Sequence, residues 1–417
     1  MADREVVIIG AGPAALAAAV SAKNSGARDV LVIERGGKPG GILNQCVHNG
    51  FGLHYFKSEL TGPEYARRFT IMAEDAGVEY MYNAMVTDIT PDRVITAISR
   101  NGAERIKVGA IILAMGCRER PRGALNIPGS RVSGVLTAGT AQLMVNIDGY
   151  MPGREVVILG SGDIGLIMAR RMTLEGAKVR AVCEIMPYSG GLRRNIAQCL
   201  DDFDIPLKFS HTVSEIHGKR RLTGVTISPV DENRAVIPGK GEYIPCDLLL
   251  LSVGLIPENE LSKKAGVTLD PVTGGPVVDN RMETNIPGIF ACGNAVHVHD
   301  LVDYVSYEGE RAGIGAAEFL RKPEGAKAYI HTKTGGGVRY CVPQNIDLRG
   351  GGESVTLSFR VDNIYRNAEI VISQGAREIK HYKSPIFTPG EMERIDIKRG
   401  MLDNENDLTI TLRKGGD

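Results

Sequence analysis

Two glycine-rich segments of the chain carry small residues at a regular spacing. The first, EVVIIGAGPAALAAAV, places Gly10, Gly12 and Ala15 between a short apolar run and an alanine-rich stretch. In such a turn the first glycine permits a tight bend, the second lets a pyrophosphate approach the backbone, and the third small residue lets helix and strand pack closely. The next apolar run, DVLVIE, ends at Glu34, whose carboxylate can accept hydrogen bonds from ribose hydroxyls. The segment therefore predicts a dinucleotide site on a strand–turn–helix unit.

The same device recurs later in the chain. EVVILGSGDIGLIMARRM contains Gly160, Gly162 and Gly165, and the following run, KVRAVCE, ends at Glu184. The second glycine segment follows the first by the same number of residues as Glu184 follows Glu34. Repetition at a constant offset makes a chance match implausible, so we expect two dinucleotide sites.

Three further apolar runs would bring the chain back to these sites. AIILAMG ends at Gly116, and LLLLSVG resembles it. A third run, Ile289 to Ala291, ends at Gly293 and Asn294. A helix is predicted to begin near Asp303, with its N-terminus directed at the bound cofactor and its dipole favouring negative charge there. Asp303 is also a candidate cap for that helix, as is Asp300.

Bulk composition narrows the class of protein. The 417 residues are too many for one core, and Lys plus Arg equals Asp plus Glu at 49 each, so nothing suggests a nucleic-acid or anionic-membrane partner. We find no apolar run near the length of a membrane span, and MADREVVIIG leads straight into a strand without a secretory leader. The seven cysteines include no CxxC pair, which fits reduced thiols. These features predict a cytoplasmic protein.

The order of these motifs resembles the FAD-dependent pyridine nucleotide–disulfide oxidoreductase superfamily over about residues 5 to 320. In that family the first fingerprint binds FAD, and the second, inserted in the FAD domain, binds NAD(P)H. The family's last strand ends in Gly-Asp, whereas this chain has Asn294, whose amide can still bond a ribityl hydroxyl. The resemblance implies FAD-binding residues Gly10, Gly12, Ala15, Glu34, Gly116, Gly293, Asn294 and Asp303, and NADH-binding residues Gly160, Gly162, Gly165 and Glu184.

The expected fold class is α/β, with two Rossmann-like dinucleotide-binding domains and a small C-terminal antiparallel β-domain. We expect the FAD domain at residues 1–110 and 247–325 and the NAD(P)H domain at 111–246. After the hydrophilic linker RKPEGAK, short alternating segments such as ESVTLSFRV and NDLTITLR predict the β-domain at 326–417. Disulfide reductases of the family instead end in an α/β interface domain with a catalytic His-Glu pair, which has no evident counterpart here.

Two stretches narrow the resemblance. CRERPRGALNIPGSRVSGVLTAGTAQ is similar to α subunits of opine oxidases and cyanide synthases. GGILNQCVHNGFGLHYFKSELTGPEYARRF and HVHDLVDYVSYEG resemble the FAD/NADH oxidoreductases associated with bacterial glycerol-3-phosphate dehydrogenase. They imply an FAD-dependent NAD(P)H oxidoreductase that passes electrons to or from a partner dehydrogenase subunit. Two alternatives remain, a stand-alone NADH oxidase that reduces oxygen and a non-catalytic nucleotide-binding subunit. A carboxylate at Glu184 favours NADH over NADPH.

Cys46, at the end of GGILNQC, is the one candidate catalytic residue. The family's CxxxxC and CxxC redox pairs are absent, so Cys46 is a small buried residue near the flavin, a solitary redox thiol, or half of a disulfide with a distant cysteine. Cys117 and Cys292 fit core positions. No metal site is expected, because four histidines show no convincing ligand pattern: His48, His54, His297 and His299. The last two could line the flavin site, cap a helix or lie at the surface.

Overall fold

The computed structural model describes residues 3–321, 329–348 and 352–414. Its contacts divide the chain into two units, Met1–Cys117 with Pro257–Asp417 and Arg118–Ile256. The predicted linker RKPEGAK lies outside the described residues apart from Arg321, as does the predicted domain start at 326.

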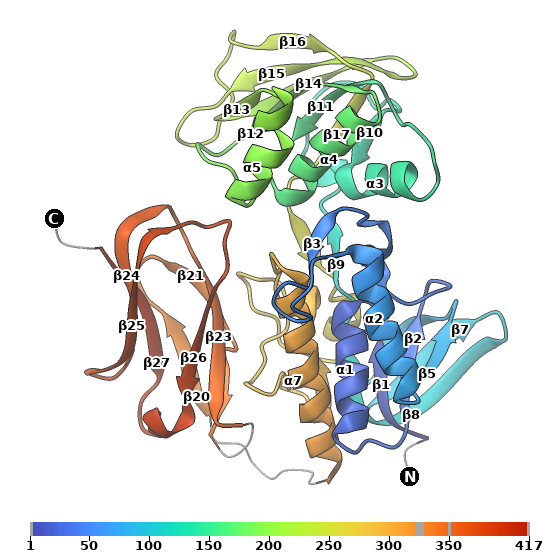
Figure 1. Cartoon of the computed structure of the whole chain (residues 1–417), viewed down its shortest axis with the longest axis vertical. Coiled ribbons are helices and arrows are strands. Elements are labelled where there is room, and N and C mark those ends of the chain that lie inside the picture. The colour runs from blue at the N-terminus through green and yellow to red at the C-terminus, as the bar shows by residue number, and fades with distance from the viewer. Residues whose placement is uncertain (1–2, 322–328, 349–351, 415–417) are drawn as a thin grey trace. The chain divides into compact units, whose positions relative to one another are not determined.

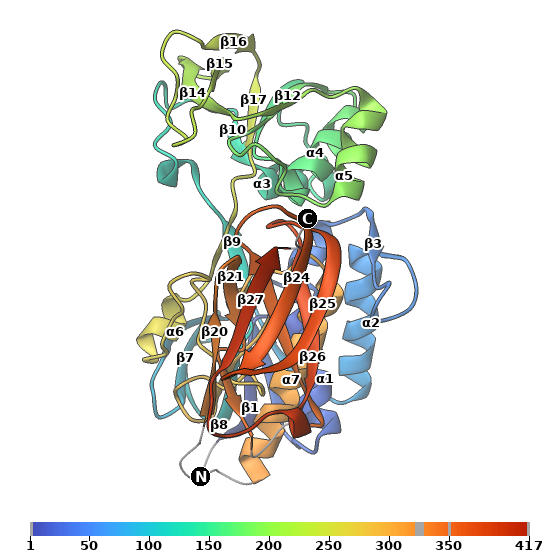
Figure 2. The same cartoon turned by 90° about the vertical axis from the view of Figure 1, so that its left-hand side faces the viewer.

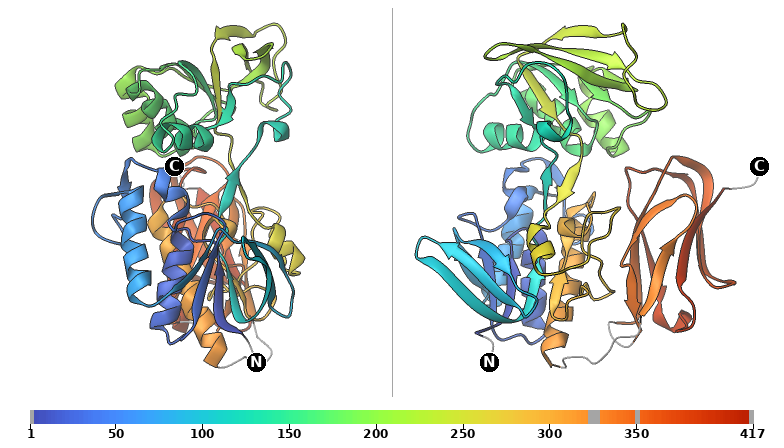
Figure 3. Two further views of the ribbon diagram at one scale, coloured as in Figure 1. Left: turned by 90° about the vertical axis from the view of Figure 1, so that its right-hand side faces the viewer. Right: turned by 180° about the vertical axis from the view of Figure 1, so that it is seen from behind.

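The first unit is built on a mainly parallel sheet (Figure 1). Its parallel strands run in the order β5-β2-β1-β8, with β19 on the far side of β8. An antiparallel hairpin of β6 and β7 extends β8 and is seen from behind in Figure 3. These strands are β1 (Arg4–Ile9), β2 (Val30–Glu34), β5 (Glu79–Tyr82), β6 (Met85–Ile89), β7 (Val94–Ser99), β8 (Gly102–Leu113) and β19 (Ile289–Ala291). The central strands are continuous apolar runs because both faces of a parallel sheet are covered.

Two helices of this unit pack unusually closely. A Cβ atom at Gly309 or Gly313 of α7 would lie 2.2 Å from the carbonyl oxygen of Ala14 or Ala18 of α1. The two helices therefore meet through their backbones, side by side in Figure 1. The helices of the unit are α1 (Pro13–Asn24), α2 (Gly62–Asp75), α6 (Glu260–Lys264) and α7 (Val302–Arg321), and its short strands are β3 (Asn49–Phe51) and β4 (Leu60–Thr61).

The second unit repeats the strand–turn–helix design. Its parallel sheet has the order β10-β17-β11-β12-β13, and a separate antiparallel sheet has the order β14-β15-β16. The strands are β10 (Val135–Thr137), β11 (Glu155–Leu159), β12 (Lys178–Glu184), β13 (Leu207–Phe209), β14 (His211–Gly218), β15 (Leu222–Pro229), β16 (Glu242–Pro245) and β17 (Leu248–Leu251). The helices are α3 (Ala138–Asn146), α4 (Asp163–Leu174) and α5 (Arg193–Cys199), and the connecting strands β9 (Cys117–Glu119) and β18 (Leu255–Pro257) pair with each other.

The domain boundaries differ from those expected from sequence. β8 continues to Leu113, and its last residues pair with β1, so residues 111–117 belong to the first unit rather than the second. Strand β17 pairs with β11, so residues 247–256 belong to the second unit. Both boundary runs are buried parallel strands, and hydrophobicity alone does not tell which of two similar sheets receives such a strand.

The C-terminal β-module, residues 329–348 and 352–414, has two sheets around its own core (Figure 2). The sheets have the orders β22-β20-β27-β24-β25 and β21-β23-β26. The strands are β20 (Tyr329–Thr334), β21 (Val338–Val342), β22 (Asn345–Asp347), β23 (Ser354–Val361), β24 (Tyr365–Gln374), β25 (Arg377–Phe387), β26 (Glu393–Lys398) and β27 (Leu408–Lys414). The pairing is antiparallel except between β20 and β27. The α/β fold class with a C-terminal β region is confirmed.

None of the helices in the described ranges is long and apolar enough to cross a membrane.

Candidate functional site

The first fingerprint forms the expected turn. Gly10 has φ +98°, and a Cβ there would lie 2.6 Å from the Ala114 carbonyl oxygen, so only glycine fits. Gly12 is the residue that precedes α1, and a Cβ added to it would meet no atom within 4 Å. Ala15 is fully buried behind it. A side chain at Gly12 would therefore point into space free of protein atoms, which fits the approach of a pyrophosphate to this backbone.

Glu34 closes this turn from the end of β2. Its carboxylate accepts hydrogen bonds from the backbone N–H of Ala11 at 2.8 Å and of Gly36 at 2.6 Å. An ionised carboxylate offers about four acceptor positions, so about two remain for ribose hydroxyls. The half-buried side chain is therefore already oriented for the role expected of it.

The second fingerprint has the same backbone geometry. Gly160 has φ +100°, and a Cβ there would lie 2.0 Å from the Ser252 carbonyl oxygen. At Gly165 a Cβ would lie 2.7 Å from the Gly160 oxygen, which explains the small residue. At Gly162, the residue that precedes α4, the nearest atom to an added Cβ is the Ser252 hydroxyl at 3.7 Å, so a ligand could approach the backbone at this position.

Glu184 repeats the hydrogen bonds of Glu34. Its carboxylate accepts from the backbone N–H of Ser161 at 2.9 Å and of Met186 at 3.0 Å, and from the Ser161 hydroxyl at 2.6 Å. In both units the acid thus accepts from the residue between the first two glycines and from the residue two positions after itself. The extra bond from the Ser161 hydroxyl leaves Glu184 about one acceptor position for a ligand.

The Gly293–Asn294 motif follows β19 in the first unit. Gly293 has φ +69° and donates its N–H to the Glu308 carboxylate at 2.7 Å. The Asn294 side-chain oxygen accepts from the N–H of His299 at 3.0 Å, and its amide nitrogen lies 3.6 Å from the Cys117 sulfur. Gly116 is the residue just before this cysteine. Its φ of +72° would strain the backbone of any residue with a side chain. The amide in place of the family's aspartate is therefore firmly oriented.

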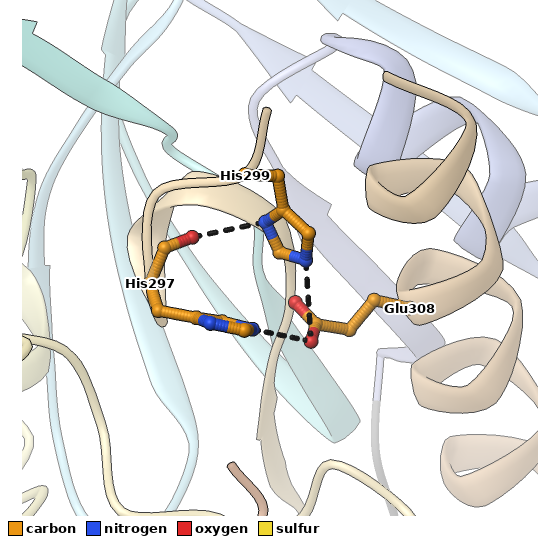
Figure 4. A group of neighbouring side chains, drawn as sticks. All are labelled: His297, His299 and Glu308. Atoms are coloured by element: carbon orange, nitrogen blue, oxygen red, sulfur yellow. Dashed lines mark hydrogen bonds and ion pairs between the residues drawn. The ribbon is translucent and has the colours of Figure 1, made fainter. Parts of the chain in front are cut away.

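A buried cluster of His297, His299 and Glu308 supports this motif (Figure 4). His297 Nε2 lies 3.0 Å from Glu308 Oε1, and His299 Nε2 lies 3.6 Å from the same oxygen. Burial lowers the pKa of His297 to about 4, so this ring is neutral at neutral pH. Burial acts to raise the pKa of Glu308, but the two histidines outweigh it and hold that pKa well below its usual value.

The ligand atoms of this cluster lie within 4.8 Å of one another, a spacing that a metal ion could bridge. The His299 Nδ1 also lies 3.0 Å from the carbonyl oxygen of His297, an orientation common in metal sites. However, the Arg311 guanidinium lies 3.6 Å from Glu308 Oε1 and already supplies a positive charge there. We therefore interpret the group as a hydrogen-bonded, ion-paired cluster.

Sequence reasoning missed Glu308. The signal that could have found it is a carboxylate on the apolar face of the predicted last helix, between Val305 and Ala312, which are both buried. A buried charge is retained only where other groups compensate it.

Asp303 lies one residue inside α7 and is 2% exposed. Its carboxylate accepts from the backbone N–H of Gly52 at 3.2 Å and of Tyr55 at 2.7 Å. It therefore fixes the loop after β3 in place, a contact that the sequence did not suggest. His48 lies just before β3 with its ring against Phe51, and His54 lies within the loop with its ring against Tyr304.

Cys46 is packed rather than activated. Its thiol donates to the carbonyl oxygen of Ile42 at 3.3 Å, and a Cβ at Gly62 would lie 2.8 Å from the Cys46 Cβ. Burial raises the pKa of this thiol to about 12, so it is not a thiolate at neutral pH. Across the described residues, which include all seven cysteines, no disulfide is formed. These observations favour the small packed residue over a redox role.

Comparison with known proteins defines the class. Residues 4–309 match the model of the family described as pyridine nucleotide-disulphide oxidoreductase, and the chain belongs to that family. It is a flavoprotein oxidoreductase with Rossmann-type domains, of a family whose members typically bind FAD and NAD(P)H.

Similar proteins include an opine oxidase subunit and thioredoxin reductases. An opine oxidase subunit from Agrobacterium tumefaciens is 28% identical over 70% of this chain, which spans only 61% of that relative's length. Thioredoxin reductase of Listeria monocytogenes is 30% identical over 76% of this chain and 94% of its own. Among solved structures, thioredoxin reductase of T. acidophilum shares the fold, with a TM-score of 0.63 and 24% identity over 76% of this chain and 99% of its own.

Proposed function

We propose that this chain transfers reducing equivalents from NADH to FAD and passes them to a partner dehydrogenase subunit. The observation that carries the proposal is the repeated acid–fingerprint hydrogen bond, Glu34 to Ala11 in one unit and Glu184 to Ser161 in the other. Two preorganised dinucleotide sites in one chain suit an enzyme that brings two such cofactors together. When bound, FAD supplies a group that accepts hydride from NADH and gives up electrons to an acceptor.

The residues of the first unit would bind and orient FAD. Gly10 and Gly12 expose the start of α1 to the pyrophosphate, and Glu34 accepts from the ribose. Gly293 and Asn294 would contact the ribityl chain, with Glu308 and His299 fixing their positions. The dipole of α7, which begins at Val302, favours negative charge at its start.

NADH is the proposed donor because of Glu184. A 2′-phosphate on the ribose would lie against this carboxylate, which is 8% exposed and already accepts three hydrogen bonds. Arg193 and Arg194 begin α5 nearby in sequence, but no hydrogen bond or ion pair among the described residues places either guanidinium beside Glu184. We therefore propose that NADPH is the poorer donor.

Two features support a partner rather than disulfide chemistry. No cysteine pair of the described chain is joined, and Cys46 is a partly buried thiol with a raised pKa, so a thiol–disulfide relay like that of a disulfide reductase has no evident site. One relative is by name one of the subunits of an opine oxidase. We propose that the partner is a second dehydrogenase chain, with glycerol-3-phosphate dehydrogenase as the specific candidate.

Purification from cells that produce the chain at its natural level tests this proposal. We expect a dehydrogenase chain to co-purify, and the complex to reduce an artificial acceptor when NADH is added. If no chain co-purifies and the isolated protein consumes NADH and oxygen rapidly, a stand-alone oxidase replaces this proposal. If the chain holds FAD but NADH does not bleach the flavin under nitrogen, the chain is the non-catalytic nucleotide-binding subunit.

A further inference from the structure

The segment between the Gly293–Asn294 motif and α7 is anchored by the C-terminal β-module. Arg360, on β23, donates one hydrogen bond to the Asp300 carboxylate and another to the Val298 carbonyl oxygen at 3.2 Å. The backbone N–H of Met392 donates to the other Asp300 oxygen at 2.6 Å. Asp300 therefore binds the module instead of capping α7.

The Arg360 guanidinium is itself fixed within the module. Its Nε donates to the Tyr340 hydroxyl at 3.2 Å, and its Nη1 donates to the Pro389 carbonyl oxygen at 3.1 Å. The Arg360 and Asp300 side chains are only 13% and 14% exposed. A planar group with this many fixed partners sets both position and orientation, which a flexible ammonium would not do.

Tyr340 extends the contact into the buried cluster. Its ring meets the His297 ring edge-on, with centroids 5.9 Å apart and an interplanar angle of 87°. His297 in turn bonds Glu308, and His299 donates its N–H to the Asn294 amide oxygen. A continuous chain of contacts thus runs from the module to the motif expected to bind the ribityl chain.

A second attachment joins the module to residues 278–281. The Asp347 backbone N–H donates to the Asn280 side chain at 2.8 Å, and Arg281 lies 3.4 Å from the buried Asp347 carboxylate. The Gln344 side chain accepts from the Val278 N–H at 3.1 Å. The module thus contacts the rest of the first unit at two separate places.

We propose that the C-terminal β-module is a positioning element of the flavin site, and that Arg360 is its key positioning residue. By fixing residues 297–300, Arg360 holds His299 and, through it, the Asn294 amide in the orientation that FAD requires. This inference rests on the proposed binding of FAD to the first unit. It assigns the module an intramolecular task, whether or not a partner also docks on it.

The test compares Arg360→Met with Arg366→Met, a matched change at an exposed arginine of the same module. FAD affinity is measured by fluorescence at a temperature where far-UV circular dichroism shows both variants folded, and the visible circular dichroism of bound FAD is recorded. We expect Arg360→Met to weaken FAD binding about tenfold and alter the flavin dichroism, and Arg366→Met to match the parent protein. A folded Arg360→Met protein with affinity within twofold of the parent overturns the inference.

Two further variants keep the test decisive if Arg360→Met fails to fold. Tyr340→Phe removes only the hydroxyl that accepts from Arg360, and Asp300→Asn weakens the ion pair. We expect each to weaken FAD binding measurably; unchanged binding in both contradicts the inference. If the parent protein itself does not bind FAD, the proposed function fails and this inference fails with it, whereas normal parent binding with unaffected variants rejects the inference alone.

Discussion

Replacement of Glu308 should disrupt the first unit more than any exposed carboxylate would. This side chain is fully buried, and its oxygens face the N–H of Gly293, the His297 ring and the Arg311 guanidinium. Glu308→Ala removes the acceptor from two buried donors and the counter-charge from the partly buried Arg311 guanidinium. Breaking a buried ion pair by removing one partner costs about 3–5 kcal/mol, a large share of the roughly 5–15 kcal/mol that stabilises a domain.

The conservative variant separates charge from shape. In Glu308→Gln one side-chain oxygen becomes an NH₂ group, which must then face a donor, because both oxygens of the natural residue accept. A buried donor without an acceptor costs about 1–3 kcal/mol, so this variant should fall between the parent and Glu308→Ala.

Urea unfolding followed by the fluorescence of released FAD measures this loss specifically in the first unit. The chain contains no tryptophan, so flavin emission is the convenient signal. Glu318→Ala, a change on the same helix at a partly exposed carboxylate, is the control and should lie within about 0.5 kcal/mol of the parent. If Glu308→Ala also lies within about 1 kcal/mol of the parent, our account of the buried cluster is wrong.

Four other outcomes are expected. The free energy of unfolding should fall by roughly 3 kcal/mol between about pH 6.5 and pH 4, because an unfolded histidine takes up a proton there while His297 stays neutral. His297→Gln, which leaves Glu308, His299 and Arg360 in place, should flatten this pH dependence in urea titrations. An unchanged pH dependence would show that other groups cause it. Glu184→Gln should narrow the preference for NADH over NADPH about tenfold, or about 1.4 kcal/mol, in anaerobic flavin reduction; a preference that stays the same argues against the role of this acid. The flavin of the Cys46→Ser protein should still be reduced by NADH. If FAD is bound but is no longer reduced, the Cys46 thiol takes part in flavin reduction. Dialysis against a chelator should leave FAD affinity and the melting temperature unchanged, whereas one tightly bound ion per chain, lost with stability, would identify the histidine cluster as a metal site.

The sequence predicted best those residues whose type is dictated by one backbone conformation at a ligand-binding turn. Gly10 and Gly160 were recognised because only glycine adopts the positive φ that their turns need. The start of helix α2 is stabilised within one short stretch of sequence, since Thr61 and Glu64 form a reciprocal cap three residues apart. The two acids were found from their spacing to the glycines, and their hydrogen bonds reach back 23 residues to the fingerprints of the same strand–turn–helix units.

Long-range contacts were not predictable in the same way. Asp300 and Asp303 were expected to act at the start of their own helix, but they bind Arg360 and the loop at Gly52, partners far away in the sequence. The role of His297 and His299 became clear only from the structure, in which α7 places Glu308 beside both rings. Such contacts depend on which surfaces pack together, which neither periodicity nor spacing encodes.

Anaerobic addition of NADH to the purified protein tests the central claim most directly. The parent protein should carry oxidised FAD, and its visible absorption should bleach when NADH is added under nitrogen. Gly12→Val, which places a side chain in the open space before α1, should lose FAD and show no such change. A parent protein that holds FAD but does not bleach with NADH, or a Gly12→Val protein with full FAD occupancy, would contradict the account.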